Sequence, residues 1–238
     1  MSRKYFINDI PENDEIILSG NEYNHIINVM RAKIGDNITF INGKGVNCNT
    51  TLLKIDRDKA FFSVDSISYD DKSDFELLVC VGLMKGDKNE FVIQKCAELG
   101  ATKIIFFESE YCIAKSKENK FERYNKISIE TSKQCGRSNF LEILPTIKFK
   151  NLVDVLKDYT HIICAYENAT EKLNTNNIKS NNKIAIIIGS EGGFSQKEID
   201  YLNDKLYIET ISLGERILRA ETAVLALTTI VMHHKEEI

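Results

Sequence analysis

The 238-residue sequence lacks the features that usually identify membrane-spanning and secreted proteins. No apolar run approaches the roughly 18 uncharged residues of a membrane span, and candidates such as residues 184–188 have only the length of a strand. The first residues contain one short basic pair but no apolar segment of signal-peptide length. These absences predict a cytoplasmic protein without a membrane segment.

Cysteine and histidine are present, but without the spacing of a metal site. No two of the six cysteines are closer than 16 residues, so there is no CxxC motif. The four histidines add no ligand cluster. We therefore expect no metal, and we expect the cysteines to be reduced and buried as small apolar side chains.

The charge is modest overall but uneven along the chain. The net charge of −4 lacks the overall basic signature of a nucleic-acid-binding protein. Residues 111–150 hold nine Lys or Arg and four Glu, a local balance of +5 that leaves −9 for the rest. This segment is either a solvated helix face or a surface that faces a polyanion.

Short strands dominate the first seventy residues. Residues 39–41, 46–55 and 60–67 form apolar-rich runs joined by polar turns, which is typical of a small β-barrel or sandwich. One helix is expected at residues 22–32, where apolar residues recur at helical spacing. The polar segment 66–76 is the expected linker, and it divides the chain into domains at residues 1–70 and 71–238.

Strands and helices alternate after this linker. Continuous apolar runs predict buried strands, and 3.6-residue periodicity and caps predict helices. Strands are expected at residues 77–84, 104–107, 161–166, 184–188 and 208–213. Helices are expected at residues 87–99, 121–135, 152–156 and 220–233, and after a capping box at 195–198; the Asn-rich segment 168–183 is expected to be an exposed loop. This alternation indicates a parallel sheet covered on both faces.

Three junctions that follow strands carry unusual residues, at the place where open α/β sheets bind ligands. Residues 189–193 contain three glycines, which allow positive φ and close backbone approach; a flexible connection is the alternative. Residues 213–223 contain charges at helical spacing, which a salt-bridged helix face also explains. The third junction ends at Glu167, for which a solvated side chain is the alternative.

The first two junctions, Gly-Ser-Glu-Gly-Gly at 189–193 and Leu-Gly-Glu-Arg-Ile-Leu-Arg-Ala-Glu-Thr-Ala at 213–223, resemble the SPOUT methyltransferases. More narrowly, the chain resembles the bacterial family that methylates N3 of a uridine in 16S ribosomal RNA. Segments 25–36, 85–100 and 130–145 support this match. The resemblance implies an α/β knotted methyltransferase domain, with a parallel sheet and a deep trefoil knot, preceded by a small PUA-like β-barrel. It also implies a homodimer that acts on the assembled small ribosomal subunit.

The resemblance assigns roles to particular residues. The residues implied to bind S-adenosylmethionine are Glu167, Gly189, Ser190, Gly193, Leu213, Gly214, Ile217, Leu218, Thr222 and Ala223. Those implied to contact RNA are His25, Arg31, Lys133, Gln134 and Arg137, and those implied to be catalytic are Arg219, Glu191 and Arg137. For His25, a structural role in the barrel is the alternative. The chain departs from the family pattern at Ser190, where proline is usual, and at residues 109–112, which lack the usual arginine.

Catalysis at uridine N3 requires that the N3 proton be removed. No histidine lies in the junction motifs, so a cationic environment from Arg219 or Arg137 is favoured over a histidine base. Glu191 is either a proton acceptor or a cofactor ligand.

Other interpretations exist for the whole chain and for its last helix. A non-catalytic RNA-binding or ribosome-assembly protein on the same fold should have lost both glycine-containing junctions, and both are present. A nucleotide-dependent α/β enzyme is disfavoured because the chain has no phosphate loop and no GxGxxG. The apolar residues of helix 220–233 indicate either a dimer interface or a helix buried within one subunit.

Overall fold

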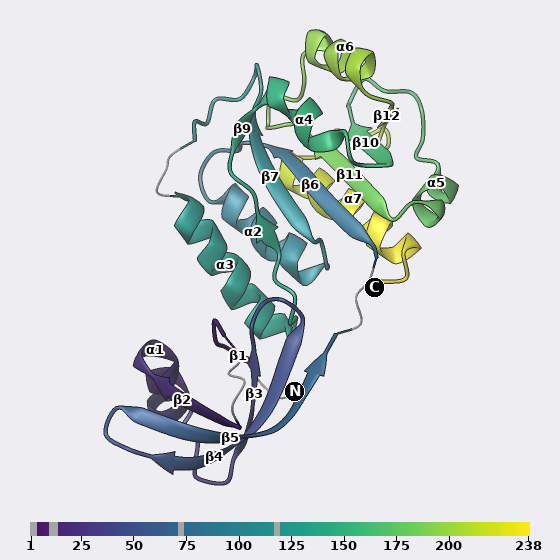
Figure 1. Ribbon diagram of the computed structural model, residues 1–238. Coiled ribbons are helices and arrows are strands. Elements are labelled where there is room, and N and C mark those ends of the chain that lie inside the picture. Colours follow the sequence, from purple (N-terminus) through teal and green to yellow (C-terminus); the bar gives the residue numbers. More distant parts are fainter. Residues whose placement is uncertain (1–3, 10–13, 71–73, 117–119) are drawn as a thin grey trace. The chain divides into compact units, whose positions relative to one another are not determined.

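The computed structural model describes residues 4–9, 14–70, 74–116 and 120–238, and the chain divides into two compact units. The first unit comprises residues 1–72 and 129–140, and the second comprises residues 73–128 and 141–238. Helix α3 (Lys120–Cys135) therefore begins in the second unit and ends in the first (Figure 1).

The first unit is built on a half-barrel sheet in the order β1-β3-β4-β5-β2. Its strands are β1 (Lys4–Phe6), β2 (Glu15–Ser19), β3 (Asn37–Ile41), β4 (Val46–Ile55) and β5 (Lys59–Tyr69). Two irregularities in the β4–β5 pairing let these long strands bend around a core where Phe40 and Phe62 meet edge to face. The three strands predicted here are confirmed, but the linker is shorter than predicted because β5 continues to Tyr69.

The helix predicted at residues 22–32 is wrong in type. A single α-helical turn, α1 (Gly20–Tyr23), leads into a π-helix, η1 (Asn24–Val29). The Met30 N–H donates to the His25 carbonyl five residues earlier, which is the hydrogen bond of a π turn. This wider turn buries Ile26 in the core, and the segment ends at Arg31, whose φ is +58°.

The second unit contains a parallel sheet in the order β12-β10-β11-β6-β7-β8, with β9 also pairing with β7. Its strands are β6 (Glu76–Gly82), β7 (Lys103–Glu108), β8 (Glu142–Ile143), β9 (Ile147–Lys148), β10 (His161–Ala165), β11 (Lys183–Ile188) and β12 (Ile208–Ile211). The five strands predicted for this part of the chain are confirmed. The two-residue strands β8 and β9 are too short to leave a periodic pattern in the sequence.

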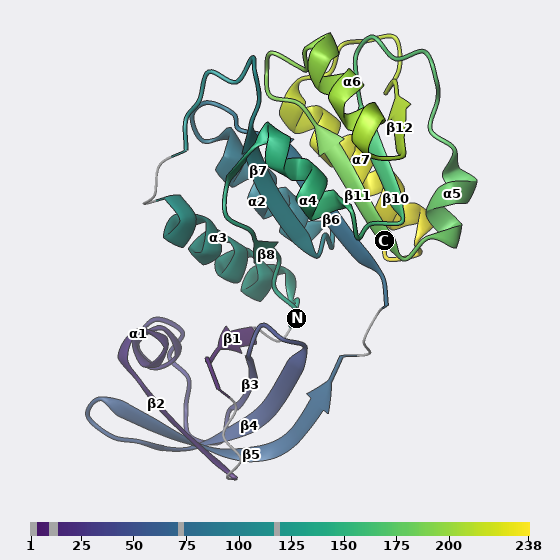
Figure 2. The same ribbon diagram turned by 45° about the horizontal axis from the view of Figure 1, so that its top comes forward.

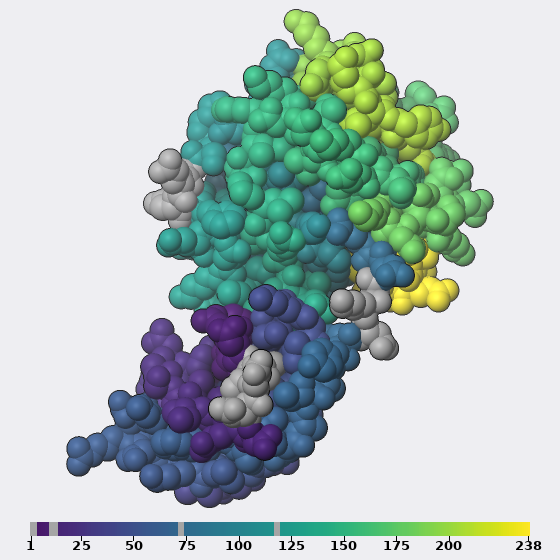
Figure 3. Space-filling view, viewed as in Figure 1, coloured from purple at the N-terminus to yellow at the C-terminus, as the bar shows by residue number. Residues whose placement is uncertain are grey.

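Helices cover both faces of this sheet, as the apolar runs predicted (Figures 1 and 2). They are α2 (Lys88–Glu98), α3, α4 (Leu152–Leu156, after a 3₁₀ turn at Phe149–Asn151), α5 (Thr175–Ser180), α6 (Gln196–Lys205) and α7 (Ala220–His234). Helices α2 and α7 pack on one face, and α4 and α6 on the other. Figure 3 shows that teal and green atoms make up most of this side of the second unit. The expected loop at 168–183 was partly wrong, since its residues 175–180 form α5.

Alternate residues of the central strands enter opposite cores. Leu77, Val79 and Val81 of β6 face α2 and α7, whereas Leu78 and Cys80 face α4 and α6. The apolar residues Ala223, Val224, Leu227 and Val231 of α7 are buried in the same unit, and Ile230 is half-buried against it. Burial within one subunit thus accounts for the apolar pattern of this helix.

Five of the six cysteines are buried and all six are free thiols, as expected, while Cys135 is exposed and corrects that expectation. Burial raises the pKa of the Cys164 thiol to about 12, aided by the nearby charge of Glu167. This thiol is therefore neutral at physiological pH and packs as an apolar group.

Candidate active site

A cavity of about 490 Å³ lies at the carboxyl ends of β12, β10 and β11, which are neighbours in the sheet. The chain leaving each strand contributes one wall, namely residues 165–167, 188–193 and 212–220. Because carboxyl ends of parallel strands share one edge, segments far apart in the sequence meet here. A cavity of this size suits a small organic ligand.

The glycine loop that follows β11 is held by close backbone packing. The Gly193 N–H donates to the Ser190 carbonyl at 3.0 Å, and Gly193 has a φ of +68°. A Cβ on Gly189 would lie 3.0 Å from the Gly193 backbone, and one on Gly82 would overlap the Ser190 nitrogen. The loop is therefore a fixed wall of the cavity rather than a flexible connection.

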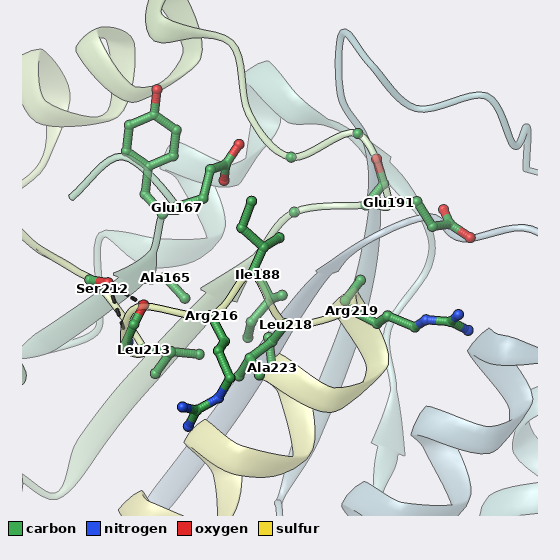
Figure 4. Close-up of a pocket in the computed structure, with 18 of the residues that line it drawn as sticks. Ala165, Glu167, Ile188, Glu191, Ser212, Leu213, Arg216, Leu218, Arg219 and Ala223 are labelled. Carbon is green, nitrogen blue, oxygen red and sulfur yellow. Dashed lines mark hydrogen bonds between the residues drawn. The ribbon is translucent and has the colours of Figure 1, made fainter.

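Glu167 faces this loop from the end of β10 (Figure 4). A Cβ on Gly193 would lie 2.5 Å from the Glu167 Oε1 atom. The Tyr166 N–H donates to the Ile211 carbonyl at 2.9 Å, which ties this junction to the end of β12. A carboxylate is thus brought to the cavity at a place where only glycine fits opposite it.

The third wall combines apolar side chains with unused backbone donors. Leu213 and Leu218 line the cavity together with Ala165, Ile188 and Ala223. In the described part of the chain, the N–H groups of residues 215–218 have no hydrogen-bond acceptor. Ser212 Oγ accepts from the Gly214 N–H, and Gly214 has a φ of +116°. An apolar surface beside free N–H groups fits a heterocycle with a polar edge.

Glu191 is held by ion pairing. Its Oε1 atom lies 3.0 Å from Lys88 Nζ and accepts from the Lys85 N–H at 3.2 Å. Lys88 Nζ also lies 3.6 Å from Glu221 at the start of α7. Burial alone would raise the pKa of Glu191, but its hydrogen bonds and the charge of Lys88 outweigh burial and leave the pKa below its ordinary value. Glu191 is therefore a poor proton acceptor at neutral pH.

Arg219 is exposed at the N-terminus of α7, and no ion pair engages it among the residues the structure describes. Figure 4 shows its side chain and that of Glu191 extending to the same side, away from Leu213. Of the two groups, only Arg219 has an unshared charge. It is thus the better placed of the two to meet an anion.

Most residues that the sequence analysis predicted to bind the cofactor line this cavity. Glu167, Gly189, Ser190, Gly193, Leu213, Gly214, Ile217, Leu218 and Ala223 line it, together with the two catalytic nominees Glu191 and Arg219. Thr222 is exposed and does not line it, because it precedes the inward-facing Ala223 by one residue of the helix.

Several lining residues had no individual role assigned from the sequence. Four of them lie within the predicted junctions 189–193 and 213–223, namely Gly192, Glu215, Arg216 and Ala220, and the others are Lys88, Ala165, Tyr166, Ile188 and Ser212. The ends of predicted strands already pointed to Ala165 and Ile188. Nothing in the sequence pattern connects Lys88, at the start of α2, with the distant glycine loop.

The nominated RNA contacts lie in the first unit. His25 is exposed and packs edge-on against Tyr5 at 5.7 Å, so it combines a structural contact with an accessible ring. Lys133 pairs with Glu22 at 2.5 Å, while Gln134 is exposed on the same helix. Arg31 is exposed and Arg137 is half-buried.

The described residues contain no helix with the length and apolar content needed to cross a membrane. They also contain no group of three or more His, Cys, Asp or Glu side chains arranged to hold a metal ion.

Comparisons with known proteins point in one direction. A family model described as an RNA methyltransferase domain matches residues 71–232, and one described as an RNA methyltransferase PUA domain matches residues 18–65. The chain is 32% identical over 242 residues to ribosomal RNA small subunit methyltransferase E of Buchnera aphidicola subsp. Schizaphis graminum, covering 95% of this chain and 92% of that protein. It is 28% identical over 250 residues to the Bacillus subtilis protein of the same name, covering 98% and 97%.

A solved structure resembles the fold over nearly its whole length. The crystal structure of a ribosomal RNA small subunit methyltransferase E from Neisseria gonorrhoeae, bound to S-adenosyl methionine, matches with a TM-score of 0.86. The two chains are 26% identical, and the match covers 98% of each.

Proposed function

We propose, from the premise that this chain belongs to the RNA methyltransferase family, that it transfers a methyl group from S-adenosylmethionine to N3 of a uridine in 16S ribosomal RNA. The observation that carries the proposal is the convergence of three strand-end loops on one cavity. The match to a relative solved with S-adenosyl methionine, over 98% of both chains, supports it. We infer that the substrate is the assembled small subunit in the cytoplasm.

The residues of the cavity fit S-adenosylmethionine. The apolar side chains Leu213 and Leu218 and the free N–H groups of residues 215–218 suit an adenine ring and its polar edge. Glu167 supplies negative charge toward a sulfonium or an ammonium group. The Ser190 hydroxyl is buried without a hydrogen-bond partner among the described residues, so it has capacity for a ligand. Thr222, which does not line the cavity, is proposed only from the family resemblance.

When bound, the cofactor supplies an electrophilic methyl group on a positively charged sulfur. The glycine loop excludes water from one side of the cavity, because its backbone packs against β6 with no room for a side chain. Lys88 positions this loop through Glu191 and the start of α7 through Glu221. The uracil loses its N3 proton to solvent before methyl transfer, and Arg219 stabilises the negative charge that remains, with Arg137 as a second candidate cation.

We infer that the first unit contributes RNA contacts through His25, Arg31, Lys133, Gln134 and Arg137. Three of these residues, Arg31, Lys133 and Arg137, carry positive charge, as phosphate contacts require. Lys133 already pairs with Glu22, so its share of that charge is partly neutralised.

We further propose a deep trefoil knot and a homodimer, both implied by the family resemblance. The insertion of β11 between β10 and β6, and the packing of the glycine loop against Gly82, support a threaded chain. For the dimer, support comes from Ile217, which is 89% exposed at the cavity rim. Light scattering at micromolar concentration should give twice the subunit mass of 27.1 kDa, and a single-subunit mass would refute the dimer.

The decisive experiment identifies the product. Small ribosomal subunits are incubated with the protein and methyl-labelled S-adenosylmethionine, and the RNA is digested to nucleosides. We expect label only in 3-methyluridine. Label in another nucleoside would refute the N3 assignment, and no label in any RNA would refute the transferase function.

A further inference from the structure

A second cavity of about 490 Å³ opens where β6 and β7 end, at the same edge of the sheet as the first. Its walls are residues 83–86, 114–116 and 144–146, together with side chains from the starts of α2 and α3. The two cavities share no lining residue. They are nevertheless adjacent, because the Lys85 N–H of the second donates to Glu191 of the first at 3.2 Å.

The interior of this cavity contains an unsatisfied polar group. Tyr124 is only 3% exposed, and its hydroxyl makes no well-formed hydrogen bond with the described residues. Asn89, beside it, is fixed by hydrogen bonds from the Met84 N–H at 3.0 Å and to the Met84 carbonyl at 2.7 Å. Burial raises the pKa of Tyr124 to about 12, so the hydroxyl stays protonated near neutral pH. Asn89 also acts as a hydrogen-bond donor to the Tyr124 oxygen. The O–H of Tyr124 itself has no acceptor among the described residues, and a buried O–H without an acceptor in a cavity points to a ligand or a bound water.

The mouth of the cavity is basic and aromatic. Three lysines, which we call the lysine rim, line it: Lys85, Lys115 and Lys120. Of these three ammonium groups, only that of Lys115 lies within 4 Å of a carboxylate in the described chain, at 3.9 Å from Glu108, and Glu108 is already paired with Lys148. Phe121 lines the same mouth and is 42% exposed. Cations beside an exposed aromatic ring are the combination that binds single-stranded nucleic acid.

We propose that the second cavity is a nucleotide-binding subsite for single-stranded ribosomal RNA. One base enters the cavity, stacks on Phe121 and accepts a hydrogen bond from the Tyr124 hydroxyl. The flanking phosphates bind the lysine rim. This inference rests on the function proposed above and extends it, because the Lys85–Glu191 contact sets the bound RNA strand beside the cofactor cavity.

Two substitutions test the interior and the mouth separately, with filter binding of labelled small-subunit ribosomal RNA as the readout. Phe121→Ala should weaken RNA binding about 5- to 150-fold, which corresponds to the roughly 1–3 kcal/mol of base stacking. Tyr124→Phe should weaken it about 2- to 12-fold, the range of one hydrogen bond. Its melting temperature should stay the same or rise, because the lost hydroxyl had no well-formed hydrogen bond. A purely structural role for the hydroxyl would instead lower the melting temperature.

The matched control is Phe91→Ala on α2, since Phe91 is 43% exposed and lies outside the cavity. It should leave RNA binding unchanged. Affinity for S-adenosylmethionine, measured by calorimetry, should be unchanged in all three variants. Chemical acetylation read by mass spectrometry should show Lys85, Lys115 and Lys120 protected by single-stranded RNA, with Lys157 as an exposed control.

Each outcome either supports or overturns the proposed subsite. Wild-type affinity in both cavity variants, or unprotected lysines in a protein that methylates RNA, overturns the subsite and leaves the proposed function intact. Equal protection by millimolar uridine 5′-monophosphate shows a mononucleotide site and overturns the RNA assignment. A wild-type protein that neither binds nor methylates this RNA, either free or within the assembled small subunit, overturns the proposed function together with the subsite.

Discussion

Gly193 and Glu167 lie so close that a Cβ at position 193 would stand 2.5 Å from the Glu167 Oε1 atom. Position 193 also has a φ of +68°, a conformation that L side chains rarely adopt. The backbone conformation therefore favours glycine at position 193, and any side chain there would also displace the Glu167 carboxylate. Any side chain at this position moves either the loop or Glu167, and both line the proposed cofactor cavity.

We therefore expect Gly193→Ala to reduce affinity for S-adenosylmethionine at least tenfold by calorimetry. Backbone strain alone should cost about 1–2 kcal/mol of stability. The control is Gly20→Ala, because Gly20 has a φ of +70° and a Cβ there would meet no atom within 4 Å. Both variants should lose similar stability, and only Gly193→Ala should lose the cofactor. Equal affinity in the two variants would remove the glycine loop from the binding site.

Lys88 provides a second test, because it joins the glycine loop and the start of α7 without belonging to either. Lys88→Met should weaken cofactor binding about two- to fivefold, as expected for partly exposed ion pairs of ~0.5–1 kcal/mol. Lys95→Met on the same helix removes an i,i+3 pair with Glu98 and a contact with the Phe91 ring, neither of which involves the cavity, and it should have no effect on cofactor binding. Equal effects of the two substitutions would show that Lys88 does not position the loop.

The same ion pair predicts a pH range for cofactor binding. The pKa of Glu191 is lowered, so its contribution is full above the ordinary glutamate value and is lost as the pH falls through its folded pKa. The hydrogen bond to Glu191 raises the pKa of Lys88, so its contribution is full below the ordinary lysine value and is lost as the pH rises through its folded pKa. Calorimetry should show an affinity that is constant between about pH 5 and 9. A titration near neutral pH would mean that another group controls binding.

The sequence predicted the residues that line the cavity better than it predicted the contacts that hold them in place. Residues 189–193 and 213–223 were identified because they contain glycine and follow apolar strands. Both a position that requires glycine and the end of an apolar run can be recognised from neighbouring residues in the sequence. The role of Lys88 depends on a contact with Glu191, 103 residues away, which no local pattern encodes. The Tyr124 cavity was missed for the same reason. The π-helix at Asn24–Val29 was missed because apolar spacing does not distinguish a π turn from an α turn over six residues.

The proposed RNA contacts in the first unit should differ in how much each contributes to the salt dependence of RNA binding. Arg137→Ala should reduce the salt dependence of RNA binding by about one unit of slope if Arg137 contacts one phosphate. Lys133→Ala should reduce it by less than one unit, because Glu22 already neutralises part of the Lys133 charge, and it should also lower the stability of the first unit. Filter binding across a salt series measures both slopes. Identical slopes in wild type and in Arg137→Ala would exclude that phosphate contact.

The final prediction concerns the proton at uridine N3. Methyl transfer needs this nitrogen deprotonated, and Glu191 is a poor base near neutral pH because its ion pair with Lys88 leaves its pKa lowered. Stabilisation of the uracil anion by a cation is the route we favour, and Arg219 has the unshared charge to do so. Single-turnover rates should therefore rise with pH toward the ionisation of the base. Arg219→Lys should lose more rate than cofactor affinity, because lysine keeps the charge but not the planar, bidentate geometry. Glu191→Gln should keep a rising pH profile, since the charge of Arg219 remains. A rate independent of pH from 6 to 9, with the chemical step shown to be rate-limiting, would exclude this mechanism and would favour proton removal by a general base of the protein.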